Sequence, residues 1–107
     1  MADKQLIYVY KGRNSPARIT VKLNGVPITF ITNGVTKLGI VIAGVEYNTS
    51  EYINFDDDGE VTFTLGSVPN PPLGKVTGRL VMYTPEYPLG KPIITEKTDF
   101  RLQFQFV

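Results

Sequence analysis

The sequence has no cysteine, no histidine and no tryptophan, and only three serines among its 107 residues. Without thiols or imidazoles the chain cannot form disulfides, a zinc site of the usual nitrogen and sulfur type, or a nucleophile activated by histidine. A carboxylate pair or a perturbed lysine is the remaining catalytic option, and so short a chain has little material for a deep cleft. We therefore expect no enzyme activity, no catalytic residue, no cofactor-binding residue and no metal ligand.

Long apolar runs are also missing. The longest, which contains Gly39–Val45, is far shorter than the roughly 20 residues that span a bilayer. The N-terminal segment MADKQLIYVYKG lacks the basic start, apolar core and small-residue cleavage site of a signal peptide. We expect a protein that has no membrane partner and that is present in the cytoplasm when it is made.

The sequence has no excess of one charge. Its 11 basic and 10 acidic residues give a net charge of +1 and are spread along the chain. A protein that binds nucleic acid gains affinity from each phosphate that its basic side chains neutralise, so it usually carries a basic cluster. We therefore expect no nucleic-acid partner.

One acidic cluster is present, at Asp56–Asp58, and Gly59 and Glu60 follow it. Calcium needs several oxygen ligands, and consecutive aspartates on an extended backbone point in opposite directions. Aspartate and glycine are also the residues that tight turns require. The cluster therefore predicts a hairpin turn between a strand that ends at Phe55 and a strand that starts at Glu60.

The strongest pattern in the sequence is the alternation of apolar and polar residues with period two, which is typical of half-buried strands. Each run stops at proline, glycine or asparagine, as at Asn24-Gly25 and Asn33-Gly34. The pattern predicts an all-β protein, an immunoglobulin-like antiparallel β-sandwich of seven or eight strands over residues 1–107. Residues 1–16 are expected to be a partly flexible N-terminal arm or an edge strand. The side chains expected to point inward from three of the runs are Ile19, Val21 and Leu23; Val61, Phe63 and Leu65; and Phe100, Leu102, Phe104 and Phe106.

Other segments give more local expectations. Val35–Ile42 is the most apolar strand and is expected to be central, with a bulge or close packing at Gly39. Pro69–Gly74 contains three prolines and should cross rigidly between sheets. Lys75–Tyr83 should be a strand, and a kink near Glu96–Asp99 should divide the last one. Glu46–Phe55 is weaker, with a strand around Glu51–Phe55.

The order of these motifs resembles the small immunoglobulin-like β-sandwich proteins of tailed phages and prophages. The resemblance covers residues 17–107. It is carried by LNGVPITF, VTKLGIVIAG, INFDDDGEVTFTLG and PPLGKVTGRLVMYTPEYPLGKPI, and is closest over Asn54–Ile93. It implies a non-enzymatic structural or accessory protein that works through protein–protein contacts in virion or tail assembly. Its partners would be other virion proteins or further copies of itself, and its locations the host cytoplasm and then the virion.

Apolar strands near both termini, Lys4–Lys11 and Arg101–Val107, could present an open edge to a partner, or could pair with each other within one sandwich. A carbohydrate- or surface-binding module is the alternative function, because Tyr47, Tyr52, Tyr83 and Tyr87 lie at strand ends or loops. The chain lacks tryptophan, the strongest stacking residue, so these tyrosines are better explained as core lids or interface anchors. The residues expected to form an interaction surface are Tyr8, Tyr10, Tyr83, Tyr87, Leu89 and Phe106.

Overall fold

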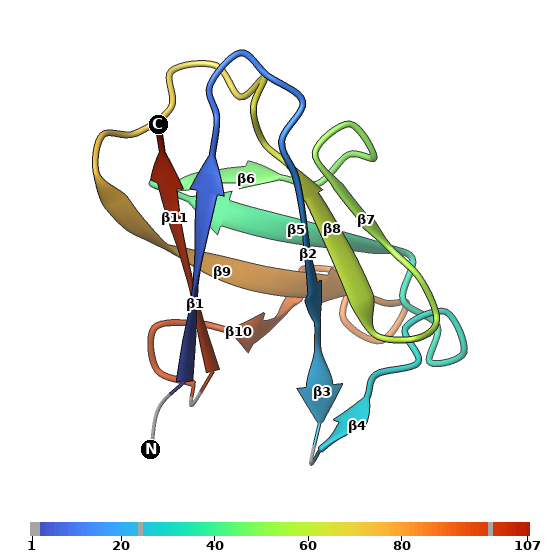
Figure 1. Ribbon diagram of the computed structural model, residues 1–107. Coiled ribbons are helices and arrows are strands. Elements are labelled where there is room, and N and C mark those ends of the chain that lie inside the picture. The colour runs from blue at the N-terminus through green and yellow to red at the C-terminus, as the bar shows by residue number, and fades with distance from the viewer. Residues whose placement is uncertain (1–2, 24, 99) are drawn as a thin grey trace.

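The computed structural model describes residues 3–23, 25–98 and 100–107, and these form strands, turns and loops without any helix (Figure 1). Accordingly, no helix in these ranges is long and apolar enough to span a membrane. Asn24 of the first turn signal, Asp99 of the expected kink and the side chain of Leu23 lie outside what is described. The strands are β1 (Asp3–Val9), β2 (Pro16–Thr20), β3 (Lys22–Leu23), β4 (Val26–Pro27), β5 (Lys37–Ile42), β6 (Val45–Tyr47), β7 (Ile53–Phe55), β8 (Glu60–Thr64), β9 (Lys75–Tyr83), β10 (Lys91–Ile94) and β11 (Phe100–Phe106).

Two sheets form the body of the molecule. The larger has the strand order β1-β11-β9-β5-β6, with β10 also paired to β9, and the smaller has the order β2-β8-β7. A short β3–β4 hairpin extends beyond the smaller sheet, which lies in front of β5 and β9 in Figure 1. The structure therefore confirms the prediction of an all-β protein and shows that its body consists of two packed sheets.

The core lies between the two sheets and follows from the period-two alternation, because alternate side chains of a strand point to one face. Phe63 of β8 and Phe104 of β11 meet edge to face across it, with ring centroids 5.4 Å apart. The predicted inward residues within the described part are buried, except for Phe100, which packs against the core while partly exposed. On the inner face of β9, Leu80 is fully buried, while Val76 and Met82 pack against the core and remain partly exposed.

The acidic cluster forms the predicted turn between β7 and β8. The Asp56 carboxylate accepts hydrogen bonds from the backbone N–H of Asp58 (2.8 Å) and of Glu60 (3.1 Å). Gly59 adopts φ 78°, a conformation that glycine takes without steric cost. No group of three or more acidic side chains suited to a metal ion occurs among the described residues.

The strand count exceeds the predicted seven or eight because Val21 separates β3 from β2 and because β6 and β10 are strands of their own. The last strand is divided, as predicted, because a turn over Thr95–Thr98 separates β10 from β11, and both pair with β9. Strand β6 had not been anticipated, because its three residues are too few to show a period. The segment Pro69–Gly74 joins β8 to β9 and so crosses between the sheets as predicted.

The two terminal strands pair with each other. β1 runs parallel to β11 in continuous register from Asp3 opposite Phe100 to Val9 opposite Phe106. β11 therefore lies between β1 and β9, which removes Arg101–Val107 from the candidate open edges. β1 is the edge strand of the larger sheet.

Candidate functional site

The structure places the two N-terminal tyrosines on the outer face of the larger sheet. Ile7 and Val9 of β1 are buried in the core, so the alternate residues point outward, and Tyr8 and Tyr10 are 52% and 57% exposed. Phe106, opposite Val9 in the neighbouring strand, is only 6% exposed. Phe106 therefore belongs to the core, and its assignment to an interaction surface is corrected: its alternation places it inward with Phe104.

The backbone of β1 is bonded to β11 on one side only. The carbonyl of Val9 accepts a hydrogen bond from the N–H of Val107 (2.8 Å), and the N–H of Lys11 donates to the carbonyl of Val107 (3.0 Å). Successive residues of an extended strand direct their N–H and C=O groups to opposite sides. The odd-numbered residues of β1 therefore bond to β11, and the even-numbered residues point their backbone groups away from the sheet.

The loop after β1 occupies the outward-facing backbone groups at the C-terminal end of the strand. The N–H of Tyr10 lies 3.4 Å from the hydroxyl of Ser15, and the carbonyl of Tyr10 accepts a hydrogen bond from the N–H of Arg13 (3.2 Å). No described strand other than β11 pairs with β1. The outward backbone groups of Lys4, Leu6 and Tyr8 remain, and we call these three residues the open edge of β1.

The remaining predicted surface residues lie elsewhere: Tyr83 ends β9, and Tyr87 and Leu89 lie in the loop between β9 and β10. Gly90 packs directly on β9, since a Cβ there would come within 2.5 Å of Val81 Cγ1 and 3.0 Å of the Tyr83 ring. The loop thus folds back over the outer face of the sheet and leaves Leu89 94% exposed. Tyr87 is half-buried, with the Lys91 ammonium 4.9 Å from its ring centre.

The two groups of predicted residues do not form one surface. Tyr8 is opposite Gln105, which in turn is opposite Lys75 at the start of β9. Tyr83 is at the other end of β9, eight residues further along. At about 3.3 Å per residue this separates the groups by roughly 26 Å. Of the predicted aromatic residues, Tyr8 and Tyr10 are exposed, Tyr83 and Tyr87 are partly buried and Phe106 is buried. The separation of the two groups depends on strand pairing.

A hydrogen-bonded cluster that the sequence did not indicate surrounds Glu46 on the outer face. Its Oε2 accepts hydrogen bonds from the Tyr83 hydroxyl (2.5 Å) and from the Asn48 amide (2.6 Å). The side chain of Glu46 lies over Gly39, 3.0 Å from where a Cβ would be, so the predicted close packing at this glycine is confirmed. The Lys37 ammonium sits 4.5 Å from the Tyr83 ring centre. The hydrogen bond to Glu46, followed by burial and by the carboxylate charge, raises the pKa of Tyr83 to about 12.

This cluster predicts a pH dependence of stability. Because the native pKa of Tyr83 lies above the usual value near 10, the neutral phenol is favoured by folding. The stabilisation is present below about pH 10 and is lost as the pH rises towards about 12. In urea unfolding at a series of alkaline pH values, the stability advantage of the wild type over Tyr83→Phe should shrink across this window. Tyrosinate absorbance should show a late transition that is missing in Tyr83→Phe and moves to lower pH in Glu46→Gln. A pH-independent difference would contradict the assignment.

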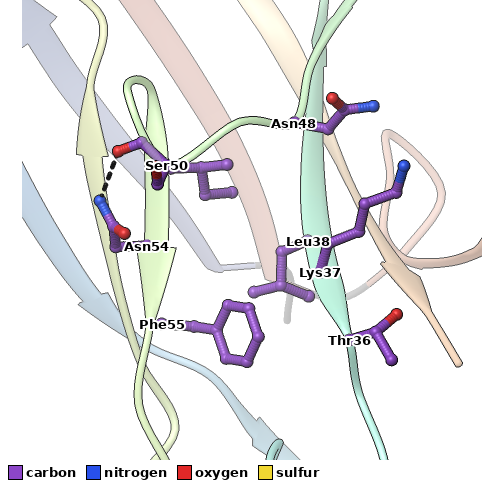
Figure 2. A pocket seen from close by; sticks show the side chains of 8 residues that line it. Thr36, Lys37, Leu38, Asn48, Ser50, Asn54 and Phe55 are labelled. Carbon is purple, nitrogen blue, oxygen red and sulfur yellow. Dashed lines mark hydrogen bonds between the residues drawn. The ribbon is translucent and has the colours of Figure 1, made fainter.

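A small cleft opens between the two sheets at the edge formed by β5 and β7. Figure 2 shows Leu38 and Phe55 pointing into it, with the ammonium of Lys37 turned outward and the Asn54 amide donating to the Ser50 carbonyl (2.8 Å). Its volume is about 170 Å³, below the range of roughly 300–1,000 Å³ typical of small-molecule sites.

A larger hollow of about 480 Å³ lies on the outer face of the larger sheet beside the β5–β6 turn. Its two charged side chains, Arg79 and Glu96, bond to each other, with the Arg79 Nε 2.9 Å from Glu96 Oε2. This hydrogen bond lowers the pKa of Glu96. Both charged side chains of the hollow are therefore already paired and do not attract a charged ligand.

The tyrosines considered for carbohydrate stacking do not form a flat exposed platform. Tyr47 and Tyr52 pack edge to face, with centroids 5.1 Å apart, and both lie partly buried against the core. Tyr83 is held by Glu46 and Lys37. The interpretation of Tyr47 and Tyr52 as core lids is thus confirmed.

No protein-family model matches the chain, and no curated protein matches it either. The geometry of the site therefore provides the basis for a functional assignment.

Proposed function

We propose that this chain is a non-enzymatic structural or accessory protein of a tailed phage or prophage, which acts through protein–protein contacts in virion or tail assembly. The observation that carries the proposal is the open edge of β1. An unpaired strand edge is a template for strand addition by a partner, because its N–H and C=O groups supply ready hydrogen bonds. The exposed ring of Tyr8 on β1 and that of Tyr10 directly after it provide rigid apolar area for the contact.

The other strands at sheet edges are less suited to such a contact. β6 and β7 have three residues each, and β10 has four, one of them Pro92. β2 has five residues and begins with Pro16, which has no N–H to donate. β1 has seven residues, contains no proline and keeps a continuous register with β11. The longest regular edge of the described chain is therefore β1, which carries the exposed Tyr8 and is followed directly by the exposed Tyr10.

The proposal includes an immunoglobulin-like topology. In such sandwiches the B, E and D strands form one sheet, and the G, F and C strands, with C′ in the variable type, form the other. The orders β2-β8-β7 and β11-β9-β5-β6 follow the same sequence of strands. The division of the chain between the two sheets therefore supports the resemblance drawn from the sequence motifs.

Leu6→Pro tests the proposed function in the phage or prophage that encodes the chain. The N–H of Leu6 points away from β11, so proline removes the donor that a partner strand needs without removing a bond to β11. We expect the yield of infectious particles to fall at least about tenfold with Leu6→Pro, on the tenfold-per-1.4 kcal/mol scale of a weakened contact. Leu6→Thr, which keeps the N–H and brings a side chain well suited to a strand, is the matched control and should support near-normal yield. Equal yields from both variants, with the proteins equally stable in melting curves, would contradict the proposal.

A further inference from the structure

We infer that the partner at the open edge of β1 is a second copy of this chain, which adds its own β1 antiparallel to the first about a twofold axis. This step rests on the proposed contact function and specifies its partner. A twofold contact is isologous, so the same three residues of each copy must complement one another. The register in which they do so can be derived from the hydrogen bonds already made by β1.

The open backbone groups select one register. In an antiparallel pair, residues that exchange both hydrogen bonds stand directly opposite each other. If Leu6 stands opposite Leu6 of the second copy, Lys4 stands opposite Tyr8 and Tyr8 opposite Lys4. Every outward N–H and C=O of the open edge then has a partner, with two hydrogen bonds for each of the three pairs.

The register shifted towards Tyr10 is excluded by the loop after β1. Placing Leu6 opposite Tyr8 of the second copy would bring Lys4 opposite Tyr10. The backbone N–H and C=O of Tyr10 are already engaged by Ser15 and Arg13 within the same chain. Pairing in that register would leave backbone groups of Lys4 without partners, which is costly once water is excluded.

The side chains on the outer face also agree with the first register. It brings two Leu6 side chains together at the axis and sets each Lys4 ammonium against the Tyr8 ring of the other copy. Lysine over tyrosine is a favourable cation–π contact, and the chain makes it twice within itself, at Lys37–Tyr83 and Lys91–Tyr87. No like charges among the three residues face each other, so the edge is self-complementary.

The absence of native cysteine allows a direct test by disulfide trapping. In Leu6→Cys the two introduced thiols face each other at the axis, where the Cα separation of a hydrogen-bonded pair, about 5.5 Å, fits a disulfide. In Lys4→Cys the two thiols are offset by about 13 Å along the strands, as they are in Tyr8→Cys. Under a glutathione redox buffer, Leu6→Cys should form covalent dimers at least about tenfold faster than either control. A mixture of Lys4→Cys with Tyr8→Cys should cross-link as a heterodimer at a rate similar to Leu6→Cys.

Light scattering on the wild-type protein should give twice the monomer mass of 11.9 kDa, and Leu6→Pro should be monomeric. A monomer at every concentration, equal trapping rates at all three positions, or a dimer that persists in Leu6→Pro would each overturn the inference. The same experiments distinguish failure of the dimer inference from failure of the proposed function. A monomeric protein whose Leu6→Pro variant still lowers particle yield overturns only the second copy as partner. A solution dimer without any effect of Leu6→Pro on yield overturns only the role in particle assembly.

Discussion

Replacing Phe104 with alanine is expected to lower the free energy of unfolding by about 3–5 kcal/mol, the range for truncating a buried phenylalanine. The Phe104 side chain is fully buried in the middle of β11 and meets Phe63 of the opposite sheet edge to face. Its ring also occupies the space above Gly78, where an added Cβ would come within 2.5 Å of the ring. Two sheets therefore lose contacts at once, and the cavity cannot close without moving both. Urea unfolding followed by circular dichroism measures the loss.

The matched control for this prediction is Gln103→Ala, one residue away on the same strand. Gln103 points to the outer face, where substitutions typically change stability by less than about 0.5 kcal/mol. Phe104→Leu should give an intermediate loss, because it retains much of the apolar volume. An unchanged unfolding midpoint for Phe104→Ala would show that this ring does not anchor the core.

Gly66→Ala is expected to destabilise the protein by about 3 kcal/mol, at the upper end of the range for overpacking. A Cβ at position 66 would lie 1.9 Å from the carbonyl oxygen of Arg13 and 2.9 Å from that of Tyr10. These are backbone atoms, so no side-chain rotation can relieve the clash. The N–H of Gly12 also donates to the carbonyl of Gly66 (2.7 Å), which holds the loop after β1 against this glycine. The methyl group must therefore displace that loop, and the thermal melting temperature measures the cost.

Ser67→Ala is the control for the glycine substitution, because Ser67 is the exposed neighbour and its change adds no atom. It should melt within a degree or two of the wild type. Hydrogen exchange gives a second readout, since the N–H groups of Gly12 and Arg13 should exchange faster in Gly66→Ala. A Gly66→Ala protein as stable as Ser67→Ala would refute close packing between this loop and the end of β8.

The sequence by itself determined the features that depend on residues close together along the chain. The period-two alternation determined which side chains of β2, β8 and β9 point inward, because a strand sends alternate side chains to opposite faces. The Asp56–Gly59 turn and the proline-rich crossing at Pro69–Gly74 were also predictable, since turn and proline geometry is local. Exposed aromatic residues of the candidate surface, such as Tyr8 and Tyr10, could be named for the same reason.

Tertiary structure alone decided how these pieces meet. The parallel pairing of β1 with β11 joins residues almost a full chain length apart, and the alternation of the two segments left open whether they pair with each other or form separate edges. This pairing withdraws β11 from the edge and leaves one side of β1 open. It also sets Tyr8 far from Tyr83, and the Ser15 and Arg13 contacts to Tyr10 limit the open edge to three residues. Alternation assigns a side chain to a face, while only strand order and long-range hydrogen bonds determine which backbone groups stay unpaired.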